Sequence, residues 1–237
     1  MNLIIYLIKE MKIKHYSIFN DHKNSKIDWD FLRKSKKDHE YYMPQTEKEY
    51  KSIINKKNYK NIIKATSNYV NTNKLNTIIS LGSGRAALEY QLKLKTGIKT
   101  IISDVTNSIF TLKKLNFFDE VLLIDITKKL DINISEKSIV ILPRIDTELS
   151  DSQIYQLFKT LNKKGVKHIL FIPAQLISIK SILIQLYILF KALIQKKSLV
   201  DCGYSRSRAK FKKLWKEYYD IHKSYNFKYL FLINKNL

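Results

Sequence analysis

Short apolar runs recur through the middle of the chain, and stretches with helical spacing of apolar residues separate them. The runs are apolar throughout rather than alternating, which is typical of parallel strands covered on both faces. Strands that alternate with helices predict an α/β fold, with a doubly wound, mostly parallel sheet and helices on both faces. The predicted strands are Thr77–Leu81, Thr100–Ser103, Val121–Ile124, Ser138–Leu142 and His168–Ile172. The predicted crossover helices are Arg85–Lys95, Asn107–Leu115 and Asp151–Lys163.

The regions that flank this pattern predict a different organisation. Residues 1–56 indicate a helical N-terminal extension or lid, and residues 57–237 form the predicted α/β domain. Apolar spacing predicts a helix from about Thr46 to Val70. Towards the C-terminus we expect two helices and a last, antiparallel edge strand, at Ser178–Gln195, Ser205–Tyr225 and Phe227–Ile233.

The helix predicted over Ser178–Gln195 is apolar on most of its circumference. That pattern favours burial in the core and, after it, a dimer interface or a contact with a membrane surface. The pattern therefore leaves open whether the chain forms a homodimer. No uncharged apolar run reaches about 18 residues, so no membrane-spanning segment is predicted. The N-terminal apolar run, Leu3–Ile8, is short and lacks a cleavage site, so we expect a cytoplasmic protein.

Composition narrows the class of protein. Hydrophobic residues make up 45% of the 237 positions, which excludes a disordered chain. The single cysteine, Cys202, excludes a disulfide framework, and the histidines show no metal-ligand spacing, so no metal site is predicted. The net charge of +22 comes from 38 Lys and only 5 Arg. Because Lys, Ile and Asn have AT-rich codons, an AT-rich genome explains the excess of lysine. Nucleic-acid sites favour arginine, so a nucleic-acid partner stays open but is not favoured.

A glycine turn carries the strongest chemical signal. Gly82 and Gly84 follow the first predicted strand and precede a helix, in a chain with only five glycines. Asp104 ends the next strand, 20 residues after Gly84. Such a turn lets a ligand approach the backbone, and the acid accepts hydrogen bonds from ribose hydroxyls. The spacing predicts a nucleotide-type cofactor, and read through Ala87 as Gly-x-Gly-x-x-Ala the motif is compatible with NAD.

Read through Ala86, the motif resembles the first motif of the class I S-adenosylmethionine-dependent methyltransferases. The resemblance extends over roughly residues 60–235 and includes Gly203-Tyr204-Ser205-Arg206-Ser207, which is similar to a stretch of some small-molecule methyltransferases. It implies a Rossmann-like fold, S-adenosylmethionine as cofactor and a small-molecule or sugar-like acceptor. The cofactor-binding residues that it implies are Ser80, Gly82, Ser83, Gly84, Asp104 and Asp125, and the substrate-binding residues are Tyr204 and Arg206.

One position departs from the family pattern. Family members place Asp or Glu two residues before the first glycine, near the methionine part of the cofactor, and this chain has Ser80 there. Serine cannot pair with the cofactor's ammonium group. The departure motivates one alternative, a non-catalytic Rossmann-like binding module. A second alternative is an NAD-dependent oxidoreductase.

The loop after the fourth predicted strand supplies the candidate catalytic residues. Ligands of open α/β sheets bind beyond the carboxyl ends of the strands. Arg144 is expected to hold an anionic substrate or the cofactor carboxylate, and Asp146 or Glu148 to deprotonate an acceptor hydroxyl. The loop lacks the Pro-Pro-aromatic motif of amino-directed DNA methyltransferases, and Cys202 follows Asp201 rather than a proline. Both facts favour a small-molecule acceptor over a nucleic-acid base.

Overall fold

The structure is a computed structural model in which part of the chain is described. The described residues are 12–15, 29–34, 42–55, 59–128, 130–174, 176–177, 182–183, 186–187, 190, 194 and 203–236.

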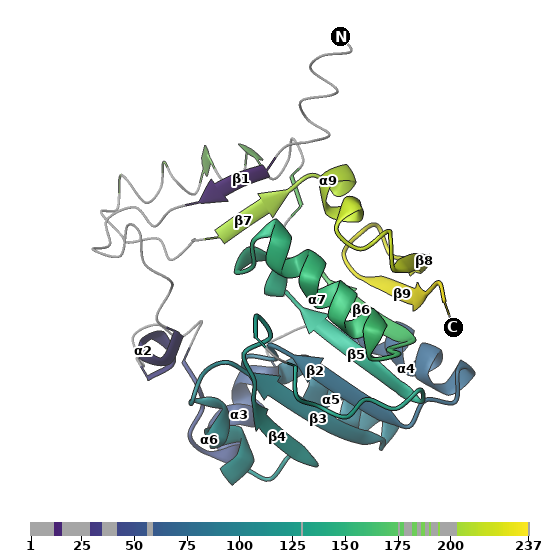
Figure 1. Cartoon of the computed structure of the whole chain (residues 1–237). Helices are drawn as coiled ribbons and strands as arrows, with labels where there is room; N and C mark the ends of the chain where they lie inside the picture. The colour runs from purple at the N-terminus through teal and green to yellow at the C-terminus, as the bar shows by residue number, and fades with distance from the viewer. Residues whose placement is uncertain are drawn as a thin grey trace.

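A seven-stranded sheet forms the centre of the fold, in the order β4-β3-β2-β5-β6-β9-β8 (Figure 1). Five neighbouring strands, from β4 to β6, are parallel. The strand β9 is antiparallel to both of its neighbours, β6 and β8, so β8 runs in the same direction as the first five. The bounds are β2 Thr77–Leu81, β3 Lys99–Asp104, β4 Glu120–Leu123, β5 Ser138–Pro143, β6 His168–Ile172, β8 Tyr219–Ser224 and β9 Leu230–Asn234. A separate two-stranded sheet pairs β1, Lys12–His15, with β7, Gly203–Arg206. The predicted parallel, doubly wound sheet is confirmed.

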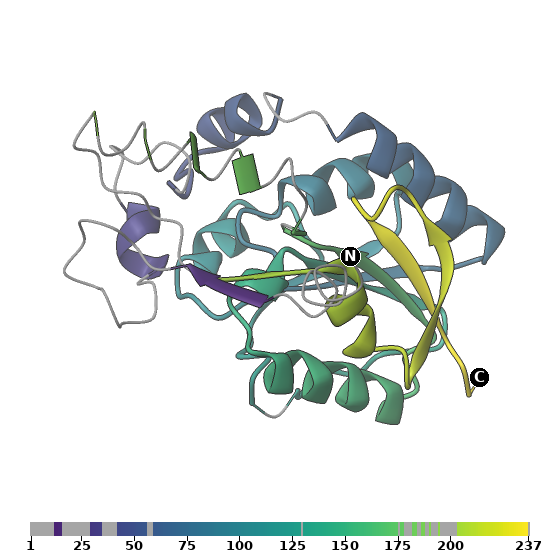
Figure 2. The same ribbon diagram turned by 90° about the horizontal axis from the view of Figure 1, so that it is seen from above.

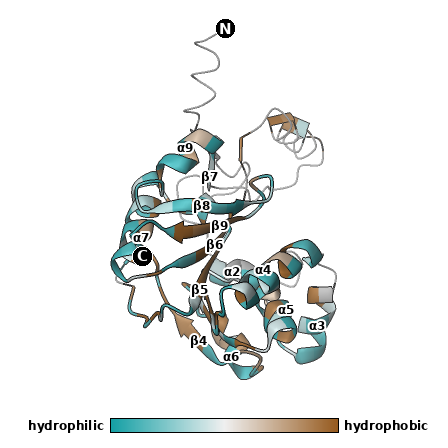
Figure 3. Cartoon of the chain, turned by 90° about the vertical axis from the view of Figure 1, so that its right-hand side faces the viewer, coloured by the Kyte–Doolittle hydropathy of each residue, from teal (hydrophilic) through white to brown (hydrophobic). Residues whose placement is uncertain are grey.

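Helices cover both faces of the large sheet (Figure 2). Alternate residues of one strand serve opposite layers: Ile79 packs in the cluster with α7, and Ile78 in the cluster with α4 and α5. Figure 3 shows the hydrophobic residues concentrated on the central strands β5, β6 and β9. The helix bounds are α2 Trp29–Lys34, α3 Glu47–Asn55, α4 Lys60–Thr72, α5 Ala87–Thr96, α6 Ile109–Lys114, α7 Asp151–Lys163 and α9 Arg208–Lys213. A capping box at Ser150 begins α7.

The predicted boundary at residue 56 does not separate two cores. Met43 and Tyr50 are buried in the same cluster as Ile102 of β3. The Tyr50 hydroxyl also donates to the backbone oxygens of Arg85 and Ala86, which end the glycine turn. Residues 42–55 therefore belong to the α/β domain. The expected N-terminal extension also contains a strand, β1, besides helices.

The helix predicted over Ser205–Tyr225 is wrong. This region holds the end of β7, the short helix α9 and then β8, a strand that we did not expect. The antiparallel strand predicted over Phe227–Ile233 is β9, which lies between β6 and β8 rather than at the edge of the sheet. Apolar Phe211, Leu214 and Trp215 gave the helical spacing, and all three are buried. Beyond these residues the chain forms the strand β8, which packs only part of its length on the core.

The helix predicted over Ser178–Gln195 lies mostly outside the described residues. Six positions in it are described as helical, and each of their side chains is exposed, so the expected core burial is wrong for these positions. Within the described part of the chain, no helix is long and apolar enough to cross a membrane.

Candidate functional site

The glycine turn and Asp104 meet at the carboxyl edge of the sheet. β2 and β3 are parallel neighbours, so their ends lie side by side. The Gly84 N–H donates to the Asp104 carboxylate across 2.8 Å, and the Gly82 and Ser83 amides donate to the Ser103 carbonyl. The structure therefore brings together the three elements of the predicted cofactor site: the strand, the glycine turn and the acid.

The backbone of the turn explains its glycines. Gly82 has φ of +77°, and a Cβ added there would lie 2.7 Å from the side chain of Ile145. A larger residue would need both a strained backbone and a displaced loop after β5. The turn then enters α5 through Ala86, which also lies in the left-handed region at φ +51°.

Arg33 of α2 forms an ion pair with Asp104, the acid of the predicted cofactor site. Its Nη1 and Nη2 lie 3.0 Å and 3.3 Å from the two oxygens of Asp104. Thr106 donates to the same carboxylate through its amide and its hydroxyl. Burial acts to raise the pKa of Asp104, but the Arg33 charge and these hydrogen bonds outweigh it, and the pKa is lowered. Asp104 is therefore ionised, and its partners are groups of the chain itself.

A second contact fixes α2 in the same place. The Asp30 carboxylate accepts from the amides of Asn107 and Ser108, just before α6. An acid at this point satisfies free amides and complements the helix dipole. Two residues of α2 thus bind the loop that follows β3. A ribose can reach both Asp104 oxygens only if Arg33 moves away.

Ser80 has a buried carboxylate as its partner. It lies on the face of β2 that α5 covers, and its hydroxyl donates to Glu89 across 2.6 Å. Glu89 is 2% exposed, and burial raises its pKa to about 7 against the effect of this hydrogen bond. Ser80 is thus paired with an acid of the following helix, α5. Their hydrogen bond joins β2 to α5, the two elements on either side of the glycine turn.

Replacing Glu89 with glutamine is expected to make the protein less sensitive to pH. The pKa of Glu89 is higher in the folded than in the unfolded protein, so its ionisation destabilises the fold as pH rises from about 4.3 to about 7. Glu89→Gln keeps the acceptor for Ser80 and has no such ionisation. Urea unfolding well above pH 7 should show the variant more stable by roughly 3 kcal/mol. Exposed Glu120→Gln is the control, and an unchanged pH slope in Glu89→Gln would contradict the assignment.

Asp146 is buried, which changes its expected role. It is 2% exposed and accepts from the Ala174 amide across 2.8 Å, which ties the loop after β5 to the end of β6. Burial raises its pKa to about 6. We had expected a base open to an acceptor. The geometry instead gives Asp146 the role of joining two loops at the edge of the sheet.

Arg206 is likewise buried rather than open to substrate. It is 1% exposed, and its guanidinium donates to the Asp151 carboxylate and to the carbonyls of Asp146 and Leu149. The sequence predicted a substrate contact here. The structure corrects this prediction, because all three guanidinium nitrogens bind the loop after β5 and the start of α7. Tyr204 packs its ring 5.1 Å from the same guanidinium.

Three other predicted residues lie near the edge of the sheet. Arg144 and Glu148 flank Asp146 and have exposed side chains. Arg144 has φ of +57°, and its amide donates to Ile172 at the end of β6. Asp125 follows β4 and accepts from the amide and hydroxyl of Thr127, which closes a local turn. None of these contacts tests their predicted roles.

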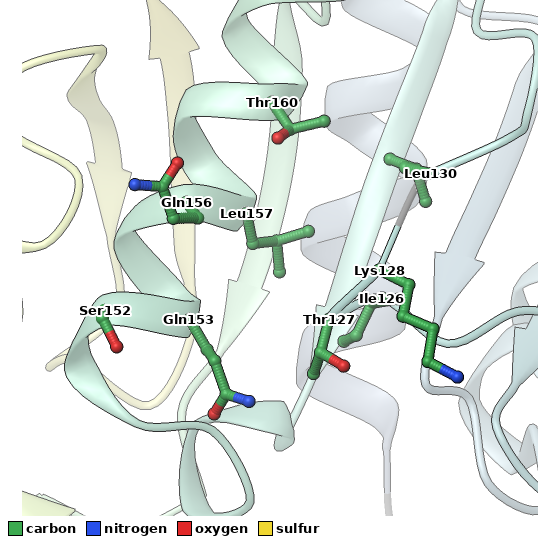
Figure 4. A pocket seen from close by; sticks show the side chains of 9 residues that line it. All are labelled: Ile126, Thr127, Lys128, Leu130, Ser152, Gln153, Gln156, Leu157 and Thr160. Carbon is green, nitrogen blue, oxygen red and sulfur yellow. The ribbon is translucent and has the colours of Figure 1, made fainter.

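A pocket of about 160 Å³ lies between α7 and the loop after β4 (Figure 4). Its lining includes Thr127, Lys128, Gln153 and Leu157. Ligand pockets for drug-sized molecules occupy about 300–1,000 Å³, and neither the glycine turn nor Asp104 contributes to the lining. We therefore do not assign the cofactor to this pocket.

Sequence reasoning missed Arg33 and Glu89. Glu89 carried a usable signal, because an acid in the first turn of the helix after the glycine turn lies close to the strand before that turn. Arg33 lies 71 residues before Asp104 in the chain, and no spacing rule joins them. His168, at the start of β6, is buried and hydrogen-bonded to Tyr69.

No protein-family model matches this sequence, and no curated protein sequence is significantly similar to it. The fold is similar to human N-acetylserotonin methyltransferase in complex with SAM, with a TM-score of 0.51 and 20% identity over 81% of this chain and 57% of that one. It is also similar to magnesium protoporphyrin IX methyltransferase from Synechocystis PCC 6803 with bound SAM, with a TM-score of 0.53 and 10% identity over 90% of this chain and 100% of that one. A protein from Pyrococcus horikoshii OT3 gives a TM-score of 0.54 at 16% identity, over 81% of this chain and 94% of that one. The chain has the class I methyltransferase fold, and it spans just over half the length of the human enzyme.

Proposed function

We propose that this chain is an S-adenosylmethionine-dependent methyltransferase that acts on a small-molecule acceptor. The observation that carries the proposal is the meeting of the Gly82–Gly84 turn with Asp104, where the Gly84 amide lies 2.8 Å from the carboxylate. Nucleotide-type cofactors bind at this edge of a doubly wound sheet, with ribose hydroxyls on such an acid. The similar human and Synechocystis enzymes were crystallised with SAM, which supports this cofactor.

The sheet itself favours this cofactor over NAD. The dinucleotide-binding order places a sixth strand directly beside the fifth. Here the last strand in the chain, β9, lies antiparallel between β6 and β8. Two solved methyltransferase structures are similar to this fold over 81% and 90% of the chain.

Each residue of the site then has a physical role. When bound, the cofactor supplies an activated methyl group on its sulfonium, and the protein's task is to align the acceptor with that group. Asp104 accepts from the ribose hydroxyls once Arg33 has moved, and Gly82 and Gly84 leave space for the ligand at the backbone. Ser83 and Asp125 are proposed cofactor contacts on the same edge. Ser80 acts indirectly, through Glu89.

The acceptor is proposed to bind on the loop after β5. Arg144 and Glu148 have exposed side chains at this edge, so they can meet an anionic group and a hydroxyl of a small molecule. Tyr204, beside Arg206, is a proposed wall of the same region. Buried Asp146 positions this loop, and Arg206 holds it from beneath.

Thermal unfolding with S-adenosylhomocysteine tests the proposal. A single-site ligand at about 100 times its dissociation constant should add roughly 2.7 kcal/mol of stability. We expect this shift in the unmodified chain and its loss in Asp104→Asn. The control is Asp220→Asn, since the Asp220 side chain is 69% exposed and lies on β8. A shift with NADH instead of S-adenosylhomocysteine would show an oxidoreductase, and no shift with either would leave a binding module of another kind.

Asp104→Asn leaves the Arg33 charge buried without its carboxylate, and the variant alone could unfold. The double variant Arg33→Ala, Asp104→Asn removes both charges. We expect it to fold and to give no shift with S-adenosylhomocysteine. A full shift in the double variant would contradict the role of Asp104.

A further inference from the structure

A row of exposed apolar side chains follows the carboxyl end of β6. Its members are helical and between 37% and 67% exposed, and they are Ile182, Leu183, Leu186, Tyr187, Phe190 and Ile194. With 3.6 residues per turn, these positions fall within a single arc of about 140° around a helix. The structure thus exposes six apolar side chains at helical spacing, and we call these six residues the apolar face.

The apolar face differs from the other exposed apolar residues of the chain. Leu94, Val105, Phe110 and Leu123 are also exposed, but they come from separate elements. Single exposed apolar residues are ordinary, whereas a contiguous patch marks a site of interaction. The residues of the apolar face lie apart from the seven-stranded sheet in both views (Figures 1 and 2).

Charge identifies the kind of partner. Residues 178–200 contain four lysines and no Asp or Glu, within a chain of net charge +22. A second copy of the chain would bring the same positive charge to the interface. An anionic lipid surface instead attracts the lysines while it accepts the apolar side chains. Tyr187 and Phe190 are also the residue types that suit the boundary between lipid headgroups and acyl chains.

We propose that the apolar face docks this protein on an anionic lipid bilayer. The proposal does not depend on the proposed function.

Sedimentation with lipid vesicles tests it on the full chain. The probe is a vesicle of phosphatidylcholine with phosphatidylserine, and phosphatidylcholine alone is the comparison. We expect binding to the anionic vesicles that weakens with added salt. The triple variant Leu186→Asn, Tyr187→Asn, Phe190→Asn should bind at least about a hundredfold more weakly, because it removes three apolar insertions. The control is Leu94→Asn, since Leu94 is 70% exposed and lies on α5 away from this face.

Three results would overturn the proposal: no binding by the unmodified chain, equal binding by the triple variant, or equal binding to uncharged vesicles. Sedimentation velocity without lipid tests the alternative that a second copy of the chain covers the apolar face. A dimer that the triple variant abolishes would assign the apolar face to a second copy of the chain. The thermal shift with S-adenosylhomocysteine should be the same in all variants, so loss of lipid binding and loss of the proposed function are separate outcomes.

Discussion

Replacing Arg33 with alanine is expected to tighten the binding of S-adenosylhomocysteine about tenfold, although the ligand-free protein becomes less stable. Arg33 holds both oxygens of Asp104, so a ribose must displace a guanidinium before it can bind. Without Arg33, the carboxylate is open to the ligand. Removing one partner of a buried ion pair costs about 3 kcal/mol, because the other charge stays buried. Isothermal titration and urea unfolding measure the two effects separately.

Arg33→Ala is expected to raise the affinity for S-adenosylhomocysteine and to lower the stability of the ligand-free protein, so the two measurements should change in opposite directions. Lys34→Ala is the matched control, since it removes a charge from the neighbouring, exposed position of α2. It should change neither binding nor stability appreciably. If Arg33→Ala bound S-adenosylhomocysteine more weakly than the unmodified chain, Arg33 would itself be a ligand contact. Equal affinity would mean that α2 leaves the site without cost.

The parallel part of the fold could be predicted from the sequence because its signals are local. Each buried strand is a continuous apolar run, and the bounds predicted for α7 agree with the structure. The glycine turn and Asp104 were also predictable, because the ends of neighbouring parallel strands meet at one edge. The similar solved structures confirm the fold, and the roles of the site residues stay predictions.

The parts that failed depend on distant contacts. Residues 219–224 form the strand β8 because they pair with β9. The helical spacing of apolar residues around Trp215 gave no indication of this pairing. Asp146 and Arg206 carry charge, which predicts exposure, but both are buried. The Ala174 amide donates to the Asp146 carboxylate, and the loop after β5 supplies acceptors for Arg206. Burial of a charged side chain requires partners that only the folded chain brings together.

Replacing Arg206 with alanine is expected to lower the free energy of unfolding by about 4 kcal/mol. The guanidinium donates to the Asp151 carboxylate at 2.7 Å, to the Asp146 carbonyl at 2.5 Å and to the Leu149 carbonyl at 2.6 Å. Alanine leaves these acceptors without their donor in a region closed to water. Lysine keeps the charge but cannot reach three acceptors at once, so Arg206→Lys should lose most of the same stability. Urea unfolding at neutral pH measures the loss.

Arg208 offers a control two residues along the chain. Its side chain is exposed and lies 5.0 Å from the ring of Phe227, a cation–π contact worth about 0.5–1 kcal/mol. Arg208→Ala should therefore cost under about 1 kcal/mol. Because Arg206 holds the loop that carries Arg144 and Glu148, its loss should also weaken acceptor binding in proportion to unfolding of that loop. An Arg206→Ala variant of normal stability that had lost only acceptor affinity would instead restore the substrate contact predicted from the sequence.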